Sequence, residues 1–142
     1  MVDGRFVEAL CVDAACSGNP GRMEYRGVHI PSGKEMFRFG PVYGTNNIGE
    51  FLAIVHGLAL MKKYGMTLPV YSDSYNALAW VREKRCGTTL ERNDQTAKLH
   101  QIIQRAEKWL QSNTYPNRVE TWMTREWGEI PADFGRKNCY KQ

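Results

Sequence analysis

Residues 6–13 read FVEALCVD, an almost continuously apolar run that stops at an aspartate. A strand of this kind is typical of the centre of a sheet, where both of its faces are covered. The next two short runs, 26–31 and 35–39, flank Ser32-Gly33 and are expected to pair as a hairpin. We therefore expect three strands in the first part of the chain, with the first of them central.

After the hairpin, apolar residues recur mainly at helical spacing. The pattern predicts helices over 48–64, 74–84 and 93–111 and short strands over 69–73 and 118–123. Asn46 or Asn47 can cap the first helix, and Pro131 is expected to open a last short helix ending near Lys137. This order predicts an α/β fold with a five-stranded mixed sheet flanked by helices.

The overall composition indicates one compact domain. The chain has 142 residues, 42% of them hydrophobic and 24% charged, which argues against disorder and against a coiled coil. No apolar run reaches bilayer length and the start lacks a signal-peptide layout, so we expect one cytosolic domain without membrane contact. The net charge of +4 is compatible with a phosphate-rich partner but decides nothing by itself.

The cysteines and histidines do not form a metal-binding pattern. No Cys-x-x-Cys pair is present and no histidine lies at zinc spacing, so we expect free thiols and packed histidines. These cysteines are Cys11, Cys16, Cys86 and Cys139.

Two aspartates, Asp13 and Asp73, each follow a predicted strand. Ligands of open α/β sheets gather at the carboxyl ends of strands, so the two side chains could face one another. Facing carboxylates favour a hard divalent cation such as Mg²⁺ or Mn²⁺ between them. Each could instead be an ordinary turn or helix-capping aspartate, and their spacing leaves both interpretations open.

Three further acids lie near expected helix starts. Glu50 falls in the first turn of the main helix, away from the apolar stripe, where a solvated acid would also be favoured by the helix dipole. Asp133 falls in the first turn of the helix expected from Pro131, and Glu129 lies outside it. We therefore expect Asp133 to be rigidly held and Glu129 to be more mobile.

Four motifs in succession resemble type 1 ribonuclease H. They are DAACSGNPG at 13–21, TNNIGE at 45–50, YSDS at 71–74 and WGEIPADFGRK at 127–137. Each is weak alone, but four in order with fitting secondary structure are specific, and they span nearly the whole chain. The resemblance implies the ribonuclease H-like fold, a single catalytic domain over 1–142 and no separate hybrid-binding domain. It also implies cleavage of the RNA strand of RNA–DNA hybrids, leaving 5′-phosphate and 3′-hydroxyl ends.

The resemblance assigns the acids to two-metal catalysis with Mg²⁺, for which Mn²⁺ would substitute. The implied metal ligands are Asp13, Glu50, Asp73 and Asp133. Asp13 would bridge both ions, and Asp73 would ligate the ion on the attacking side. Glu129 would assist catalysis from a position where many relatives carry a histidine and one subgroup carries a glutamate.

The resemblance also implies contacts to the hybrid. The RNA strand would be met by Cys16, Gly18, Asn46 and Asn47. The DNA strand would be met by Asn19, Thr45, Asn47 and Trp80, and one of its phosphates by Thr88, Thr89 and Thr124. Helix capping, a polar loop and core packing are the respective alternatives for the asparagines, the threonines and Trp80. Tyr75 stands where the subgroup often has glutamine, which puts one RNA contact in doubt.

Two other functions remain open at this stage. A hybrid-binding module that has lost catalysis would be expected to show a broken carboxylate set, whereas all four acids are present. A junction resolvase or integrase would lack the Thr45-Asn46-Asn47 and Ser17-Gly18-Asn19 elements together. For the ribonuclease, we expect a monomer with the RNA–DNA hybrid as partner and no obligate protein partner.

Overall fold

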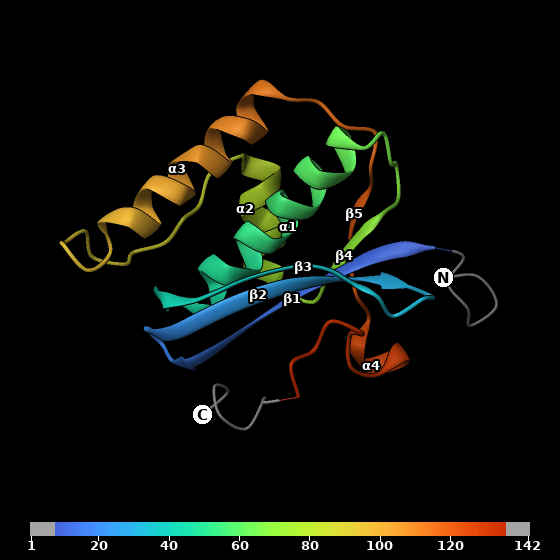
Figure 1. The fold of residues 1–142 in the computed structure, drawn as a ribbon, viewed down its shortest axis with the longest axis horizontal. Coiled ribbons are helices and arrows are strands. Elements are labelled where there is room, and N and C mark those ends of the chain that lie inside the picture. Colours follow the sequence, from blue (N-terminus) through green and yellow to red (C-terminus); the bar gives the residue numbers. More distant parts are fainter. Residues whose placement is uncertain (1–7, 136–142) are drawn as a thin grey trace.

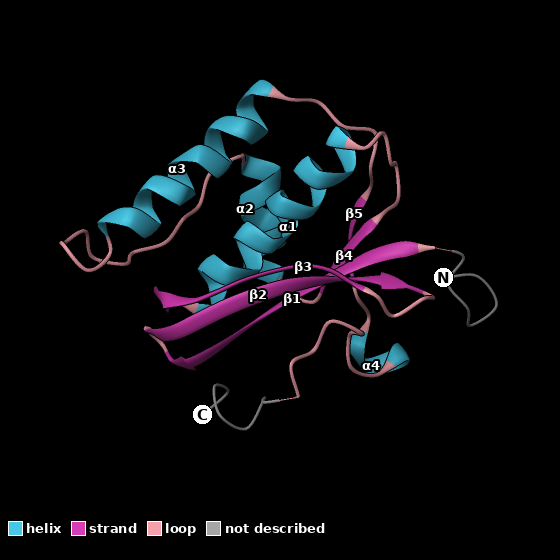
Figure 2. Cartoon of the chain, in the orientation of Figure 1, coloured by secondary structure: helices cyan, strands magenta, loops and turns pink. Residues whose placement is uncertain are grey.

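The computed structural model describes residues 8–135. Figure 1 follows these elements along the chain, and Figure 2 separates helices from strands. The elements are β1 (Ala9–Gly18), β2 (Gly21–Ile30), β3 (Glu35–Gly44), α1 (Asn46–Lys63), β4 (Val70–Ser72), α2 (Tyr75–Glu83), α3 (Ala97–Ser112), β5 (Val119–Thr121) and α4 (Thr124–Trp127).

The strands form one mixed sheet in the order β3-β2-β1-β4-β5. β1 pairs antiparallel with β2 and parallel with β4, so it is central. Its alternate residues are buried on opposite faces: Val12 belongs to one apolar cluster and Cys11 to another. The expected five-stranded mixed sheet is confirmed, with residues 9–13 of the apolar segment in its central strand; Phe6 and Val7 lie outside the described residues.

The two faces of the sheet are covered differently. Figure 1 shows α1, α2 and α3 on one face and the chain around α4 on the other. The helical face holds the larger core, in which Phe51, Ile54 and Leu58 of α1 are fully buried. The opposite face holds a smaller cluster that includes Trp122 and Ile130. None of the helices within residues 8–135 is long and apolar enough to cross a bilayer.

The β1–β2 hairpin extends past Asp13, where the apolar run of the sequence stops, into the Gly- and Pro-rich residues 16–21. The β1–β2 ladder continues to the pair Gly18–Gly21, which leaves Asn19-Pro20 as the turn. Gly18 has a φ of +97°, and a Cβ on Gly21 would lie 2.1 Å from the Ser17 carbonyl oxygen. The glycines therefore permit the tight turn that lets the ladder continue.

Local hydrogen bonds move two helix starts from their expected positions. Thr45 caps α1, because its hydroxyl accepts a bond from Ile48 N at 3.2 Å, so Asn46 and Asn47 lie inside the helix instead of capping it. α3 begins at Ala97 and not at 93, since residues 94–96 form a turn before it.

The helix expected from Pro131 is wrong for the described residues. Pro131-Ala132 form a turn in which Asp133 N donates to Ile130 O at 2.9 Å, and 133–135 are not helical. Ile130 and Ala132 are buried against the sheet while Pro131 is exposed, so packing on the smaller core outweighs the local helix signal. The expected helix end at Lys137 lies outside the described residues.

The cysteines and histidines pack as expected. The described cysteines Cys11, Cys16 and Cys86 are buried free thiols, and Cys139 lies outside the described residues. His56 stacks on Phe37 with ring centroids 4.1 Å apart, and its Nδ1 is 2.8 Å from the Tyr25 hydroxyl oxygen.

Candidate active site

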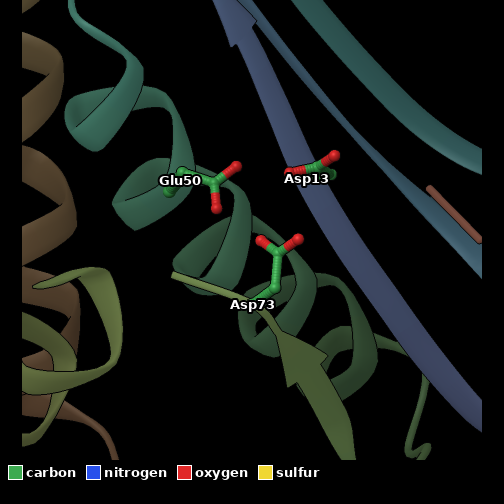
Figure 3. A group of neighbouring side chains, drawn as sticks. All are labelled: Asp13, Glu50 and Asp73. Atoms are coloured by element: carbon green, nitrogen blue, oxygen red, sulfur yellow. The ribbon is translucent and has the colours of Figure 1, made fainter. Parts of the chain in front are cut away.

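Three carboxylates from different elements meet where β4 ends beside the middle of β1. Asp13 comes from β1, Glu50 from the first turns of α1, and Asp73 follows the end of β4 (Figure 3). One carboxylate oxygen from each lies within 4.8 Å of the others. Parallel pairing of Cys11 with Tyr71 carries two residues further to Asp13 and Asp73, so the register itself brings these aspartates together.

The other two acids join the same hollow, which we call the carboxylate cavity. It has a volume of about 440 Å³. It is lined by Asp13, Ala14, Asn46, Asn47, Glu50, Asp73, Ser74, Tyr75, Asn76, Thr124, Glu129 and Asp133. The structure thus places together every acid that the sequence singled out. Tyr75, which replaces the expected glutamine, is 74% exposed at this cavity.

Burial makes the inner carboxylates hard to ionise. Asp13 and Glu50 are 5% and 2% exposed. Burial raises the pKa of Asp13 to about 7, a hydrogen bond with Glu50 opposes this rise, and the negative charge of Asp73 adds to it. Burial, followed by the charge of Asp13, holds the pKa of Glu50 well above its ordinary value. Without a cation, the pair therefore retains a proton at neutral pH.

The donor set fits a hard divalent cation. Oε1 of Glu50 is buried without a hydrogen-bond partner in the part of the chain that the structure describes. An unsatisfied buried oxygen is costly, and several carboxylates around one space are the ligands that Mg²⁺ and Mn²⁺ prefer. Asp13, Glu50 and Asp73 could therefore hold such an ion, with Asp133 on the wall of the same cavity.

A second hollow of about 520 Å³ lies beside the first, and we call it the threonine groove. It is lined by Asn19, Pro20, Tyr43, Thr45, Asn47, Trp80, Gly87, Thr88, Thr89, Leu90, Glu91, Asn93 and Thr96. Asn47 lines both hollows, so they are neighbours that share this residue. The residues expected on the DNA side, except Thr124, are gathered here.

Trp80 packs against the core and also faces the threonine groove. Its ring packs against Phe51 in an edge-to-face contact with centroids 6.3 Å apart, and it also lines the threonine groove. A Cβ on Gly87 would lie 2.7 Å from Trp80 Nε1, so the loop carrying the threonines closes directly against this ring.

Two expected nucleic-acid contacts need correction. Cys16 is 1% exposed, because β1 continues past it and its thiol donates to Gly44 O at 3.5 Å, so its side chain packs in the core and lines neither hollow. Thr124 lines the carboxylate cavity and is absent from the lining of the threonine groove. It therefore does not complete a pocket with Thr88 and Thr89.

The remaining polar residues are linked across the first turn. Asn46 N donates to Asn19 Oδ1 at 3.0 Å, which couples the β1–β2 turn to the start of α1. Gly18 is exposed in that turn, and Asn46 Oδ1 is buried without a hydrogen-bond partner among residues 8–135.

Sequence reasoning missed Arg26, which donates to the carbonyl oxygens of Ala132 and Asp133. No motif marks it, since these partners are 106 and 107 residues away.

Known proteins share this fold and sequence pattern. The chain matches the RNase H family model over residues 7–126. A ribonuclease H of Saccharopolyspora erythraea is 32% identical over 103 residues, covering 70% of this chain and 64% of that protein. The chain thus spans less than two thirds of that relative's length.

Two solved structures show the shared fold. The N-terminal RNase H domain of a Mycobacterium tuberculosis protein matches with a TM-score of 0.52 and 20% identity, covering 85% of this chain and 89% of that one. An RNase H1 isolated from compost by a metagenomic approach matches with a TM-score of 0.51 and 19% identity, covering 85% and 86%. Since the family model matches most of its length, the chain belongs to the ribonuclease H family.

Proposed function

We propose that this protein hydrolyses the RNA strand of RNA–DNA hybrids by two-metal-ion catalysis. The observation that carries the proposal is the convergence of Asp13, Glu50 and Asp73 within 4.8 Å in a cavity that shares Asn47 with a polar groove. Membership of the ribonuclease H family supports the same reaction. The products would carry 5′-phosphate and 3′-hydroxyl ends.

The four aspartate and glutamate side chains would hold the metal. Two Mg²⁺ ions, when bound, supply an activated water and stabilise the charge of the leaving 3′ oxygen. Asp13 would be the ligand shared by both ions, as the resemblance to type 1 ribonuclease H implies, and one of its oxygens lies within 4.8 Å of oxygens of Glu50 and Asp73. Asp73 would face the attacking side, and Asp133 would complete the set from the cavity wall. Binding must displace the proton that Asp13 and Glu50 retain, so we expect metal affinity to rise with pH.

The two hollows would receive the two strands of the hybrid. The 2′-hydroxyl marks RNA, and the amide side chains of Asn46 and Asn47 in the carboxylate cavity are suited to recognise it. Thr88 and Thr89 in the threonine groove present hydroxyls that suit a DNA phosphate. We place the RNA over the carboxylates and the DNA over the threonines. Since one chain supplies both hollows, we propose that the protein works as a monomer.

The decisive experiment compares substrates and metals in one assay. End-labelled hybrid, duplex DNA and duplex RNA are incubated with the protein in Mg²⁺, in Mn²⁺ or in excess chelator, and the ends of any products are mapped. We expect cleavage of the RNA strand in the hybrid alone, and none in chelator. Equal cleavage of duplex DNA would indicate another nuclease on this fold, and tight hybrid binding without cleavage would indicate a binding module.

A further inference from the structure

Asp133 needs a support that the local sequence does not provide. It lines the carboxylate cavity, yet no helix carries it. Asp133 N donates to Ile130 O at 2.9 Å, and Gly135 N donates to Asp133 Oδ2 at 3.0 Å. These turns shape the segment, and burial of Ile130 and Ala132 on the smaller core holds the residues before Asp133, but neither contact is made by Asp133 to the sheet itself. A metal ligand has to be held to within about 0.5 Å, so a longer-range contact must place it.

Arg26 on β2 provides this contact. Its Nε donates to Ala132 O at 2.8 Å, and its Nη2 donates to Asp133 O at 2.7 Å. Arg26 is also the direct partner of Asp13 in the β1–β2 register, and directly opposed residues of an antiparallel pair share a face of the sheet. One side chain therefore connects the strand position opposite Asp13 to the backbone that carries Asp133.

Phe134, the residue after Asp133, contacts both Arg26 and a second arginine, Arg38. The guanidinium carbon of Arg26 lies 4.9 Å from the centroid of the Phe134 ring, and that of Arg38 lies 5.1 Å from it. Arg38 is itself held by Glu24 at 2.9 Å and Glu35 at 2.7 Å. Stacking of a cation on an aromatic face is favourable, so β2 and β3 both hold the residue next to Asp133.

We propose that Arg26 is a positioning residue: by holding the carbonyls of Ala132 and Asp133 against β2, it sets the position of the Asp133 carboxylate relative to Asp13. Arginine suits this task because its planar fork donates to two carbonyls at once and stacks on a ring, whereas lysine presents a single point charge. The inference rests on the proposed function, in which Asp133 ligates a metal ion. The affinity for that ion should then depend on Arg26.

The test measures Mn²⁺ binding by titration calorimetry, without nucleic acid. We expect Arg26→Met to weaken binding at the site that involves Asp133 by roughly tenfold, as is usual when a group that orients a metal ligand is lost. Arg26→Lys should fall between this variant and the wild type, and it decides the question if Arg26→Met does not fold. Arg105→Met removes the same charge from the exposed surface of α3 and should bind Mn²⁺ like the wild type.

A double-mutant cycle separates positioning from a general effect on stability. Mn²⁺ binding is compared for Arg26→Met, Asp133→Asn and the double variant. If Arg26 acts through Asp133, the double variant should bind Mn²⁺ no more weakly than Asp133→Asn alone. Additive losses would overturn the proposal, as would wild-type Mn²⁺ affinity in both Arg26 variants.

The cleavage assay keeps this inference distinct from the proposed function. If the wild type cuts no hybrid but shows the expected Mn²⁺ pattern, the proposed function fails and the positioning role of Arg26 stands. If the wild type cuts the hybrid and both Arg26 variants bind Mn²⁺ normally, the positioning role alone is overturned.

Discussion

The carboxylate cavity and the threonine groove are neighbours built on opposite electrostatic principles. The cavity gathers acids, two of them buried, and leaves Glu50 Oε1 without a hydrogen-bond partner among the described residues. The groove is lined by neutral side chains apart from Glu91, and its Thr88 hydroxyl already accepts a bond from Leu90 N at 3.2 Å. The cavity therefore carries a cost in the free energy of folding that a cation would relieve, whereas the groove does not.

The largest effect should come from neutralising a ligand in the cavity. Asp73→Asn keeps the size of the side chain but removes a charge that a hard cation requires. We expect single-turnover cleavage of the hybrid to fall by about 10³-fold, the upper end of the range for losing one electrostatic stabiliser of a transition state. Hybrid affinity, measured separately, should change little, because the groove is untouched. Retained cleavage would contradict the assignment of Asp73.

The second prediction concerns the stability of the metal-free protein. The folded-state pKa of Asp13 is about 7, above its ordinary value of 3.8, so the native state binds more protons than the unfolded state between these values. The free energy of unfolding of the metal-free protein therefore falls as the pH rises through this window. Asp13→Asn should be more stable than the wild type at pH 8 by roughly 1–3 kcal/mol, and no more stable near pH 4.

Denaturant unfolding in chelator at the two pH values measures this difference. Asp94→Asn, an exposed loop aspartate, is the matched control and should show no such dependence. Saturating Mg²⁺ should reverse the order, because the wild type gains binding free energy that Asp13→Asn loses. If Asp13→Asn were destabilised equally at both pH values, the Asp13 carboxylate would not lower the stability of the metal-free protein.

A smaller effect is expected from Glu129, the exposed acid of the cavity. The sequence suggested that Glu129 is mobile and that a helix fixes Asp133. In the structure that helix is absent, and Arg26 instead donates to the carbonyl oxygens of Ala132 and Asp133. We expect Glu129→Gln to slow steady-state turnover roughly tenfold and single-turnover cleavage much less, because a mobile carboxylate would assist product release.

Both rates are measured on the same hybrid in Mg²⁺. Glu126→Gln, an exposed acid on α4, should leave both rates unchanged. Asp133→Asn should lower both rates, with partial recovery in Mn²⁺. Equal losses of the two rates in Glu129→Gln would mean that Glu129 acts in the chemical step.

The smallest effect should come from the groove. Thr89→Ala removes one hydroxyl that would face a DNA phosphate, so hybrid affinity should fall by about threefold to tenfold, the value of one hydrogen bond. Mn²⁺ affinity should stay at the wild-type value. Binding is measured at moderate salt, where phosphate contacts are visible, with the exposed Thr67→Ala as control. Unchanged hybrid affinity would remove Thr89 from the interface.

The sequence by itself determined the order of strands and helices as far as β5 and singled out the acids, but it did not predict α4 and it expected a helix from Pro131 that is absent among the described residues. The apolar run before Asp13 predicts a central strand, and the strand before Asp73 pairs in parallel with it. The expected strand end at Asp13 is wrong, because β1 continues to Gly18. Each of these signals is a pattern of residues adjacent in the chain, so it can be read without knowing the tertiary structure. Glu50 and Asp133 were identified from the motifs that contain them, because each of these motifs is a contiguous stretch of sequence.

The tertiary structure alone decided how the acids are held and which polar residues reach a ligand. The turn at Pro131 replaces an expected helix, because Ile130 and Ala132 gain more from burial on the sheet than the segment gains from coiling. Cys16 is buried in the core for a related reason, since β1 continues to pair with β2 beyond it. Arg26 carries no local signal at all, because its value lies in a contact with Asp133 across 107 residues, and only packing creates such a contact.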